Sequence, residues 1–271
     1  MTIAELMRAS ALSGMDPIDT RALMRATLGV NDAYLIAHAD DEVSAPHAAH
    51  FRALAARRAA GEPVAYIVGE RAFYDHVFKV TPAVLIPRAE TELLVELALQ
   101  RDPGCVLDMG TGSGCIAISI ALARPAAQVT ALDQSESALA IARENAALLN
   151  ARNVTFQSGN WFDAVQNQRF DIIVANPPYV AAGDAHLTQG DLRFEPASAL
   201  AAGVDGLADI RLIIDGARRH LTPGGWLLFE HGYDQATRCR ELLSQADFGE
   251  VRSWRDLAGI DRVSGGRAAS L

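Results

Sequence analysis

From residue 105 to residue 254 the sequence alternates short apolar runs with longer amphipathic segments, and this alternation restricts the fold more than any other feature. The apolar runs are nearly continuous, as in strands that are buried on both faces. Strands are predicted at 105–109, 128–133, 153–157, 170–175, 226–230 and 250–254, and helices at 90–100, 113–123, 135–150, 208–220 and 235–246. This order predicts a parallel, doubly wound α/β sheet with helices on both faces.

Residues 1–70 follow a different pattern, in which short helical segments end at Gly or Pro. The second of these segments, "PIDTRALMRATLG", has Asp16 as its predicted N-cap and Pro17 at its first position. The predicted core residues of the first two helices are Ile3, Leu6, Met7, Leu12, Ile18, Leu23, Met24 and Leu28. Two more helices are predicted in "NDAYLIAHA" and "APHAAHFRALAARRAAG", so this part of the chain is predicted to be a small helical bundle.

The stretch between these two parts alternates aromatic and aliphatic side chains and contains "YDH" at the position of a turn. That pattern is typical of a β-hairpin. We therefore expect a helical domain at 1–70, a linking hairpin at 71–88 and an α/β domain at 89–271.

The charge balance argues against a protein that binds nucleic acid directly. The 271 residues include 24 Lys and Arg against 33 Asp and Glu, a net charge of −9, whereas a phosphate backbone usually requires a basic excess. The three cysteines have no metal-type spacing and are typical of a reducing compartment, so no metal is expected. No membrane span or signal peptide is visible, and we expect a cytoplasmic protein.

A glycine-rich turn joins the first strand of the α/β domain to its helix, in "CVLDMGTGSGCIAISIALA". Its residues are Gly110, Thr111, Gly112, Ser113 and Gly114. Alternating glycines let the backbone turn sharply and approach a ligand, and the helix start offers free N–H groups to it. A plain turn that needs one glycine is the simpler alternative. Asp133 ends the next strand, 19 residues after Gly114, where a carboxylate can accept hydrogen bonds from ribose hydroxyls.

The third strand leads into "SGNWFDA", in which Asn160 and Trp161 offer an amide and an aromatic face to a flat ring. A structural role for Trp161, in the core or at a hinge, is equally consistent with the sequence. The spacing Gly-x-Gly-x-Gly differs from the Gly-x-Gly-x-x-Gly of dinucleotide folds. It resembles the S-adenosylmethionine loop of Rossmann-like methyltransferases, and this resemblance implies that Asn160 and Trp161 meet the adenine of that cofactor.

The sequence "NPPY" at 176–179 follows the fourth strand, on the edge where doubly wound sheets bind ligands. The Asn176 side-chain oxygen and the Pro177 carbonyl can accept the two hydrogens of a planar nitrogen, which favours the positive charge that develops during methyl transfer. Tyr179 can pack on the flat substrate group. A stiff Pro-Pro turn with Asn176 as an Asx cap is the simpler alternative. The glycine-rich loop on the same edge favours the functional interpretation.

Seven longer segments narrow the comparison to one family. They are "GEPVAYIVGERAFY" (61–74), "LIPRAETELLVE" (85–96), "LDMGTGSGCIAISIAL" (107–122), "NPPYV" (176–180), "RFEPASALAAGVDGL" (193–207), "GGWLLFEHGYDQ" (224–235) and "DLAGIDRVSGGR" (256–267). In this order they resemble the protein-glutamine N5-methyltransferases of peptide chain release factors, the PrmC/HemK type. The resemblance implies a Rossmann-like seven-stranded S-adenosylmethionine methyltransferase domain with a helical N-terminal domain and a connecting β-hairpin.

The resemblance also implies an activity, which is methyl transfer from S-adenosylmethionine to the glutamine amide of the Gly-Gly-Gln motif in class I release factors. The implied cofactor-binding residues are Gly110, Thr111, Gly112, Ser113, Gly114, Asp133, Trp161 and Asn176. The implied catalytic residues are Asn176, Pro177 and Tyr179, and the implied substrate-binding residues are Asn176, Pro177, Pro178, Tyr179 and Glu195. Pro196 is expected to shape the same pocket, and Arg88 and Glu90 to lie near the cofactor. The helical domain is expected to dock the release factor, and the enzyme is expected to be a monomer.

Two positions depart from the family pattern. Ala89 replaces a proline in "IPRAETE", and Asn160 replaces an aspartate in "GNWF". Two other functions stay open at this point. An adenine-N6 methyltransferase of nucleic acids would hold its acceptor nitrogen with the same two groups, the Asn176 oxygen and the Pro177 carbonyl, which we call the clamp. The acidic net charge and the absence of a basic recognition segment weigh against this function. A non-catalytic release-factor-binding module is the second alternative, and it would need neither the loop nor the clamp.

Overall fold

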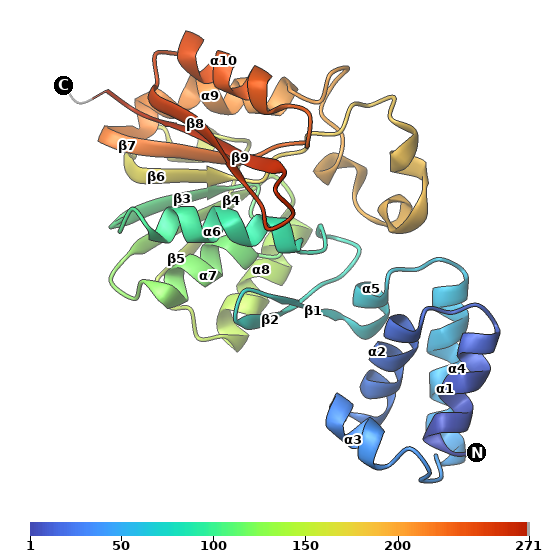
Figure 1. Ribbon diagram of the computed structural model, residues 1–271. Coiled ribbons are helices and arrows are strands. Elements are labelled where there is room, and N and C mark those ends of the chain that lie inside the picture. Colours follow the sequence, from blue (N-terminus) through green and yellow to red (C-terminus); the bar gives the residue numbers. More distant parts are fainter. Residues whose placement is uncertain (270–271) are drawn as a thin grey trace. The chain divides into compact units, whose positions relative to one another are not determined.

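The computed structural model describes residues 1–269, which divide into two compact units. The first unit contains Met1–Glu70 and Gly190–Phe194, and the second contains Arg71–Gln189 and the chain from Glu195 onward. Figure 1 shows that the first unit is helical and that the second is a sheet flanked by helices. No helix in the described part of the chain is both long and apolar enough to cross a membrane.

Helices dominate the first unit. They are α1 (Ile3–Leu12), α2 (Pro17–Leu28), α3 (Asp32–Ala37), α4 (Ala45–Ala59) and α5 (Val64–Val68). Side chains cap the first four of them, because Thr2, Asp16, Asn31 and Ser44 each accept a backbone N–H of the first turn. The buried residues Leu23, Met24 and Phe51 lie in the core that the helices share. The predicted helical bundle is confirmed.

Two of the predicted core residues of this bundle are wrong. Leu12 is 84% exposed and Ile18 is 78% exposed. Each lies in the terminal turn of its helix, where the described neighbours do not cover it. Helix α5 was not among the predicted elements; it ends at Gly69, whose φ of +86° suits glycine.

The segment Gly190–Phe194, a 3₁₀ helix (η4), belongs to the first unit although it is distant in sequence. Arg58 lies 133 residues before Asp191 and donates to its carboxylate at 2.9 Å, and it also donates to Asp19 at 2.6 Å. Arg193 donates to the carbonyl of Ala60 at 2.9 Å. These polar contacts attach the segment to the ends of α2 and α4.

Strands β1 (Glu70–Phe73) and β2 (His76–Lys79) form a two-stranded sheet. The turn is made by Tyr74 and Asp75, inside the predicted "YDH", and Tyr74 has a φ of +53°. The buried rings of Phe73 and Phe78 meet edge to face with their centroids 6.1 Å apart. The hairpin is confirmed, but it is shorter than the predicted 71–88, because the residues after β2 continue without strand structure.

The main sheet of the second unit has seven strands. They are β3 (Cys105–Met109), β4 (Gln128–Asp133), β5 (Val154–Ser158), β6 (Phe170–Ala175), β7 (Leu221–Glu230), β8 (Gly249–Arg255) and β9 (Asp261–Arg267). Their order in the sheet is β5-β4-β3-β6-β7-β9-β8.

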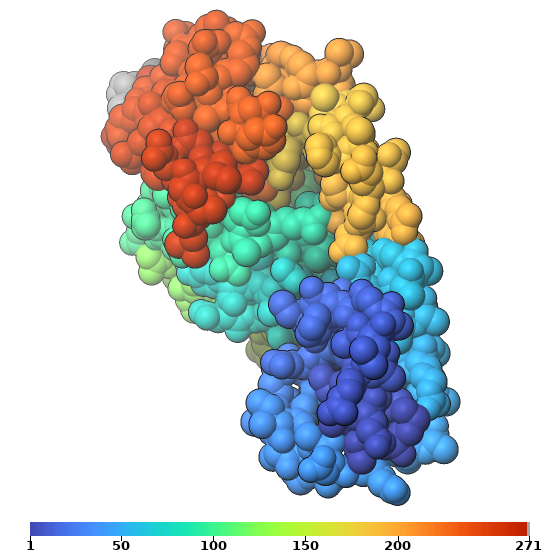
Figure 2. Space-filling model, turned by 45° about the vertical axis from the view of Figure 1, so that its right-hand side comes forward, coloured from blue at the N-terminus to red at the C-terminus, as the bar shows by residue number. Residues whose placement is uncertain are grey.

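The predicted Rossmann-like fold is confirmed, but one strand departs from the predicted parallel arrangement. Strands β3 to β7 pair in parallel, but β9 lies antiparallel between β7 and β8. Only a short turn separates β8 from β9, and a connection that short joins antiparallel strands. Strand β9 was also not predicted as a strand. The space-filling view shows this C-terminal edge (red) at the surface (Figure 2).

Helices cover both faces of the sheet, as predicted (Figure 1). The first face packs against α6 (Glu92–Leu99), α7 (Cys115–Ala123) and α8 (Glu136–Leu148), and the second against α9 (Ala208–His220) and α10 (Ala236–Gln245). Successive residues of β3 contribute to opposite cores: Val106 belongs to the first, and Leu107 to the second. Predicted helix 90–100 is divided into a 3₁₀ turn, η1 (Ala89–Thr91), and α6.

The strand order creates a crevice between β3 and β6. The chain continues from β3 to β4 and β5 on one side, and from β6 to β7 on the other, so the connections diverge at this point. Ligands of doubly wound sheets bind at the carboxyl ends of such strands. Met109 of β3 pairs with Ala175 of β6, which brings the glycine-rich loop and the "NPPY" sequence to the same place.

Candidate methyl-transfer site

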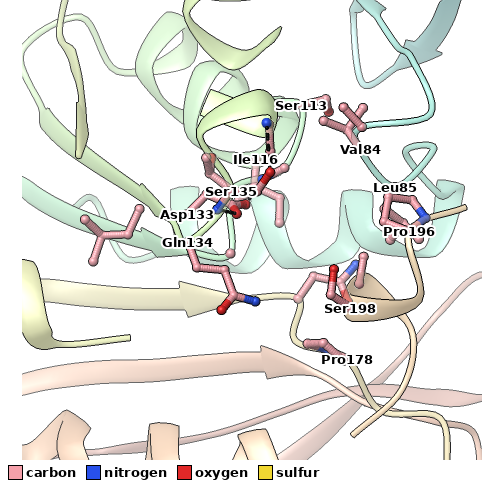
Figure 3. Close-up of a pocket in the computed structure, with 18 of the residues that line it drawn as sticks. Val84, Leu85, Ser113, Ile116, Asp133, Gln134, Ser135, Pro178, Pro196 and Ser198 are labelled. Atoms are coloured by element: carbon pink, nitrogen blue, oxygen red, sulfur yellow. Dashed lines mark hydrogen bonds between the residues drawn. The ribbon is translucent and has the colours of Figure 1, made fainter. Parts of the chain in front are cut away.

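A cavity of about 550 Å³ lies at the carboxyl ends of β3, β4 and β6. Figure 3 shows Asp133, Gln134 and Ser135 on one side of it, and Leu85 and Pro196 on the other. Its volume falls in the range of roughly 300–1,000 Å³ that small-molecule sites occupy.

The glycine-rich loop forms one wall of this cavity. Gly110, Gly112 and Gly114 have φ values of +72°, +55° and +83°, in the left-handed region that favours glycine. Gly114 is also tightly packed, because a Cβ at this position would lie 3.2 Å from the Cβ of Ala142. Helix α7 begins at Cys115, two residues later than predicted, because a left-handed residue cannot continue a right-handed helix.

Asp108 supports the loop from inside the unit. Its Oδ2 accepts the hydroxyl of Thr111 at 2.6 Å and the backbone N–H of Ala117 at 3.2 Å. The side chain is fully buried, and this burial raises the pKa of Asp108 to about 7. Asp108 is not among the residues that line the cavity, so it acts on the shape of the loop rather than on a ligand.

Asp133, at the end of β4, connects the loop to the next helix. Its Oδ2 accepts the N–H of Gly112 at 2.9 Å, and its Oδ1 accepts the N–H of Ser135 at 2.9 Å. Burial raises the pKa of Asp133 from its ordinary value. Each carboxylate oxygen keeps a second lone pair. Since Asp133 lines the cavity, those lone pairs can accept two neighbouring hydroxyls of a ligand, as a ribose offers them.

Asn160 and Trp161 reach the cavity from beyond the end of β5. Trp161 is half-buried and has a φ of +48°, which is unusual for a bulky residue. It also packs against the core of the second sheet face. The two alternatives for Trp161 therefore both hold, since its side chain lies on the cavity wall and also packs against the core.

Asn176, at the end of β6, lines the cavity together with Pro178. Its Nδ2 donates to the hydroxyl of Thr91 at 3.1 Å, which leaves Oδ1 as the acceptor end of the amide. Tyr179 donates to the buried carboxylate of Glu230 at 3.1 Å. Burial, reinforced by the charge of Glu230, raises the pKa of Tyr179, so that its hydroxyl stays neutral.

The structure brings eleven of the predicted site residues to the cavity wall: Arg88, Gly110, Thr111, Gly112, Ser113, Asp133, Asn160, Trp161, Asn176, Pro178 and Pro196. The other predicted residues are not on the wall: Glu90, Gly114, Pro177, Tyr179 and Glu195. Glu195 is buried, and its carboxylate accepts Arg88 at 2.5 Å and the N–H of Ile86 at 3.1 Å. Arg88 itself lines the cavity, so Glu195 lies behind it.

Several wall residues were not identified from the sequence: Pro82, Ala83, Val84, Leu85, Thr91, Ser198, Ala199, Asp209 and Leu212. The segment 82–85 could have been identified from the sequence, because the two prolines of "TPAVLIPR" stiffen a loop that can hold a ligand. Asp209 and Leu212 belong to α9, and no local pattern separates them from other residues of an amphipathic helix.

The donor set fits a nucleoside ligand with a charged tail. The wall combines apolar side chains such as Ile116 and Leu132 with the carboxylate of Asp133 and the backbone N–H groups at the start of α7. Among residues 1–269, no group of three or more His, Cys, Asp and Glu side chains is arranged to hold a metal ion.

Comparison with known proteins agrees with this geometry. The family "Methyltransferase small domain" matches residues 89–200, and the family "PrmC N-terminal domain" matches residues 3–69. The release factor glutamine methyltransferase of Bordetella pertussis is 53% identical over 258 residues, which cover 93% of this chain and 95% of that protein. The protein of the same name from Burkholderia pseudomallei is 51% identical over 276 residues, covering 98% of this chain and 96% of that protein.

A solved methyltransferase from Pyrococcus furiosus matches 79% of this chain and 97% of its own, with a TM-score of 0.57 and 18% identity, which shows the shared fold. The two sequence relatives show more than the fold, because about half of their residues are identical over nearly the whole length. The chain belongs to the release factor glutamine methyltransferase family.

Proposed function

We propose that this chain transfers a methyl group from S-adenosylmethionine to the side-chain amide nitrogen, N5, of the glutamine in the Gly-Gly-Gln motif of class I peptide chain release factors. One observation carries the proposal: the glycine-rich loop, Asp133 and the amide of Asn176 line a single cavity. A methyl donor and a planar nitrogen can therefore be held next to each other. The curated relatives named as release factor glutamine methyltransferases support the choice of substrate.

S-adenosylmethionine supplies an electrophilic methyl group when it is bound. The residues proposed to hold it are Gly110 to Gly114, Asp133 and Trp161. Asp133 accepts the ribose hydroxyls, and Trp161 offers an aromatic face to the adenine. The backbone N–H groups at the start of α7 offer partial positive charge to a carboxylate. These residues bind and orient, and none of them needs to change its protonation state.

The acceptor nitrogen needs help from the protein, because the lone pair of an amide is delocalised. Asn176 Oδ1 and the Pro177 carbonyl accept its two hydrogens, which orients the nitrogen and stabilises the positive charge that develops on it. Tyr179, which does not line the cavity, is proposed to pack on the flat group once the substrate has entered. The methylated nitrogen carries a positive charge and is strongly acidic, so it loses one proton to solvent and becomes neutral, and no dedicated base is required.

A folded protein substrate must also be recognised outside the cavity. We propose the first unit for this docking role, since it matches the PrmC N-terminal family. The net charge of −9 favours a protein partner over direct contact with nucleic acid. We place the reaction in the cytoplasm and expect the enzyme to act as a monomer.

The test is methyl transfer from labelled S-adenosylmethionine to a class I release factor, with DNA and RNA as competing acceptors in parallel reactions. We expect label on the Gly-Gly-Gln glutamine, located by mass spectrometry of the digested factor. A release factor with that glutamine replaced by alanine is the matched control and should take up no label. Label on adenine in the nucleic acid, or tight factor binding without transfer, would overturn the proposal.

A further inference from the structure

Glu230, the last residue of β7, is a buried acid that the reaction described above does not use. It is 1% exposed, and it forms no salt bridge with any of the described residues. Two hydroxyl groups donate to it, Thr91 to Oε2 at 2.6 Å and Tyr179 to Oε1 at 3.1 Å. Burial raises the pKa of Glu230, whereas both hydroxyls favour its ionised form. A buried acid costs stability, so its place beside the reaction site calls for an explanation.

Thr91 connects this acid to the substrate clamp. A threonine hydroxyl has one hydrogen to donate and can accept others. The hydrogen of Thr91 goes to Glu230, and its oxygen accepts Nδ2 of Asn176 at 3.1 Å. Thr91 is 2% exposed and lies at the end of η1, so it is fixed between the two partners. The result is a chain of hydrogen bonds from Asn176 through Thr91 to Glu230, across three separate elements.

We propose that Glu230 and Thr91 are positioning residues that fix which end of the Asn176 amide faces the substrate. The oxygen and nitrogen ends of an asparagine amide have nearly the same shape, so packing alone does not distinguish them. Because the hydrogen of Thr91 is committed to a carboxylate, its oxygen can only accept, and it selects Nδ2 of Asn176. Oδ1 is then directed to the acceptor nitrogen.

The opposite orientation would oppose the reaction. An inverted Asn176 would present its own N–H groups to the N–H groups of the substrate amide, and two donors repel each other. A neutral side chain in place of Glu230 permits this inversion, since it can donate to the Thr91 oxygen and release the Thr91 hydrogen toward Asn176. This inference rests on the proposed function, because it requires Asn176 Oδ1 to accept a substrate hydrogen.

The decisive variants are Glu230→Gln and Thr91→Val, which keep size and shape but remove the directional chain. For each, kcat should fall by about 100-fold, the loss typical of a preorganised hydrogen-bonding group. The KM for the release factor and the Kd for S-adenosylmethionine should change by less than about threefold, because the clamp acts on charge that develops in the transition state. Thr91→Ser keeps the hydroxyl and should recover kcat to within about fivefold of wild type, roughly the scatter of a conservative change.

A double variant tests whether Glu230 acts through Thr91. Adding Glu230→Gln to Thr91→Val should lower kcat by no more than about twofold further, since the chain is already broken. Losses that multiply would show that Glu230 acts by a route other than Thr91, such as its hydrogen bond with Tyr179, and would overturn the inference. Ser264→Ala is the matched control, because it also removes a buried hydroxyl, one bonded to His231 at 2.8 Å, and it should leave kcat within about twofold.

The failure of this inference differs from that of the proposed function. If the wild-type protein labels no release factor, both the proposed function and this inference are wrong. Wild-type transfer with unchanged kcat in folded Thr91→Val or Glu230→Gln would end only the inference. If thermal melting shows that Glu230→Gln does not fold, the comparison of Thr91→Val with Thr91→Ser, which differ at one hydroxyl, decides the result.

Discussion

The two sides of the cavity are built from different parts of the polypeptide. On the side of the glycine-rich loop, the wall depends on the backbone conformation of three glycines, and Asp133 is fixed by the N–H groups of Gly112 and Ser135. On the other side, the wall depends on side chains, with Asn176 fixed by Thr91 and Thr91 by Glu230. The first side is assembled from residues close in sequence, whereas the second joins β6, η1 and β7.

The two sides are therefore sensitive to different kinds of substitution. The glycine-rich side depends on backbone angles that only glycine adopts at low cost. A wall of side chains depends on individual hydrogen bonds, each of which one substitution can remove. We therefore expect substitutions on the first side to act on binding and stability, and substitutions on the second side to act on the rate of transfer.

The largest effect is expected at the side-chain clamp. Asn176→Ala removes the acceptor for a substrate hydrogen, and kcat should fall by about 100- to 1,000-fold. The Kd for S-adenosylmethionine, measured by calorimetry, should stay within about threefold of wild type, since the glycine-rich loop is unchanged. Retained turnover would show that the clamp is elsewhere.

The next effect is expected at Asp108, which supports the glycine-rich loop, and concerns how stability depends on pH. The pKa of Asp108 is raised from 3.8 to about 7, so the folded state binds a proton that the unfolded state has released. The free energy of unfolding should therefore decrease as the pH rises from about 4 to about 7, by roughly 2–4 kcal/mol from this residue. Asp108→Asn should remove this decrease and be stabilising relative to wild type at pH 8. Urea unfolding of both proteins at pH 5 and pH 8 measures the difference, and identical pH dependence would contradict the assignment.

Two glycines of the loop offer an internal comparison. Gly112→Ala meets no atom within 4 Å and suffers only from its positive φ, whereas Gly114→Ala also meets Ala142. We expect Gly114→Ala to lower the free energy of unfolding by about 2–3 kcal/mol and Gly112→Ala by about 1 kcal/mol. Denaturant unfolding of the two variants tests the order, and an equal loss would mean that packing at Gly114 is not important.

Asp133→Ala tests the glycine-rich side of the cavity by its effect on cofactor binding. We expect the Kd for S-adenosylmethionine to rise by about tenfold, because two charge-assisted hydrogen bonds to hydroxyls are lost. At saturating cofactor, kcat should stay close to wild type, in contrast to Asn176→Ala. Calorimetry and initial rates separate these two results, and an unchanged Kd would show that the hydroxyls bind elsewhere.

The smallest effect is expected at Ala89, the first residue of η1, which ends at Thr91. Arg88 already has an extended backbone, with φ −99° and ψ 144°, which a following proline requires. Ala89→Pro should therefore raise the free energy of unfolding by about 0.4–1 kcal/mol, by restricting the unfolded chain. A destabilised variant would show that the turn needs a conformation that proline lacks.

Much of the site near the glycine-rich loop was predictable from the sequence. The loop, Asp133 and Asn176 each lie at the end of an apolar strand, and parallel strands end at the same edge of a sheet. Thr91 and Glu230 were not identified, because they lie 139 residues apart and neither has a distinctive local pattern. Their role depends on a contact that only folding creates.

The antiparallel edge of the sheet also depends on contacts between distant segments. "DRVSGGR" is poor in residues that favour strands, because glycines have low strand propensity. In the structure these glycines are required, since a Cβ at Gly265 would lie 2.4 Å from the carbonyl oxygen of Leu227 in the neighbouring strand. Close approach between strands, rather than local preference, makes β9 a strand.

Sequence patterns alone predicted the α/β architecture, the helical first part, the family, and the glycine-rich loop and "NPPY" sequence that meet at one sheet edge. They could do so because periodicity, capping and glycine turns act over a few residues of the chain. Only the tertiary structure decided that β9 is antiparallel, that Glu195 lies behind Arg88, and that Asn176 is tied through Thr91 to Glu230. Those features are contacts between distant segments, and burial gives them their strength, because a buried polar group must find its partner within the fold.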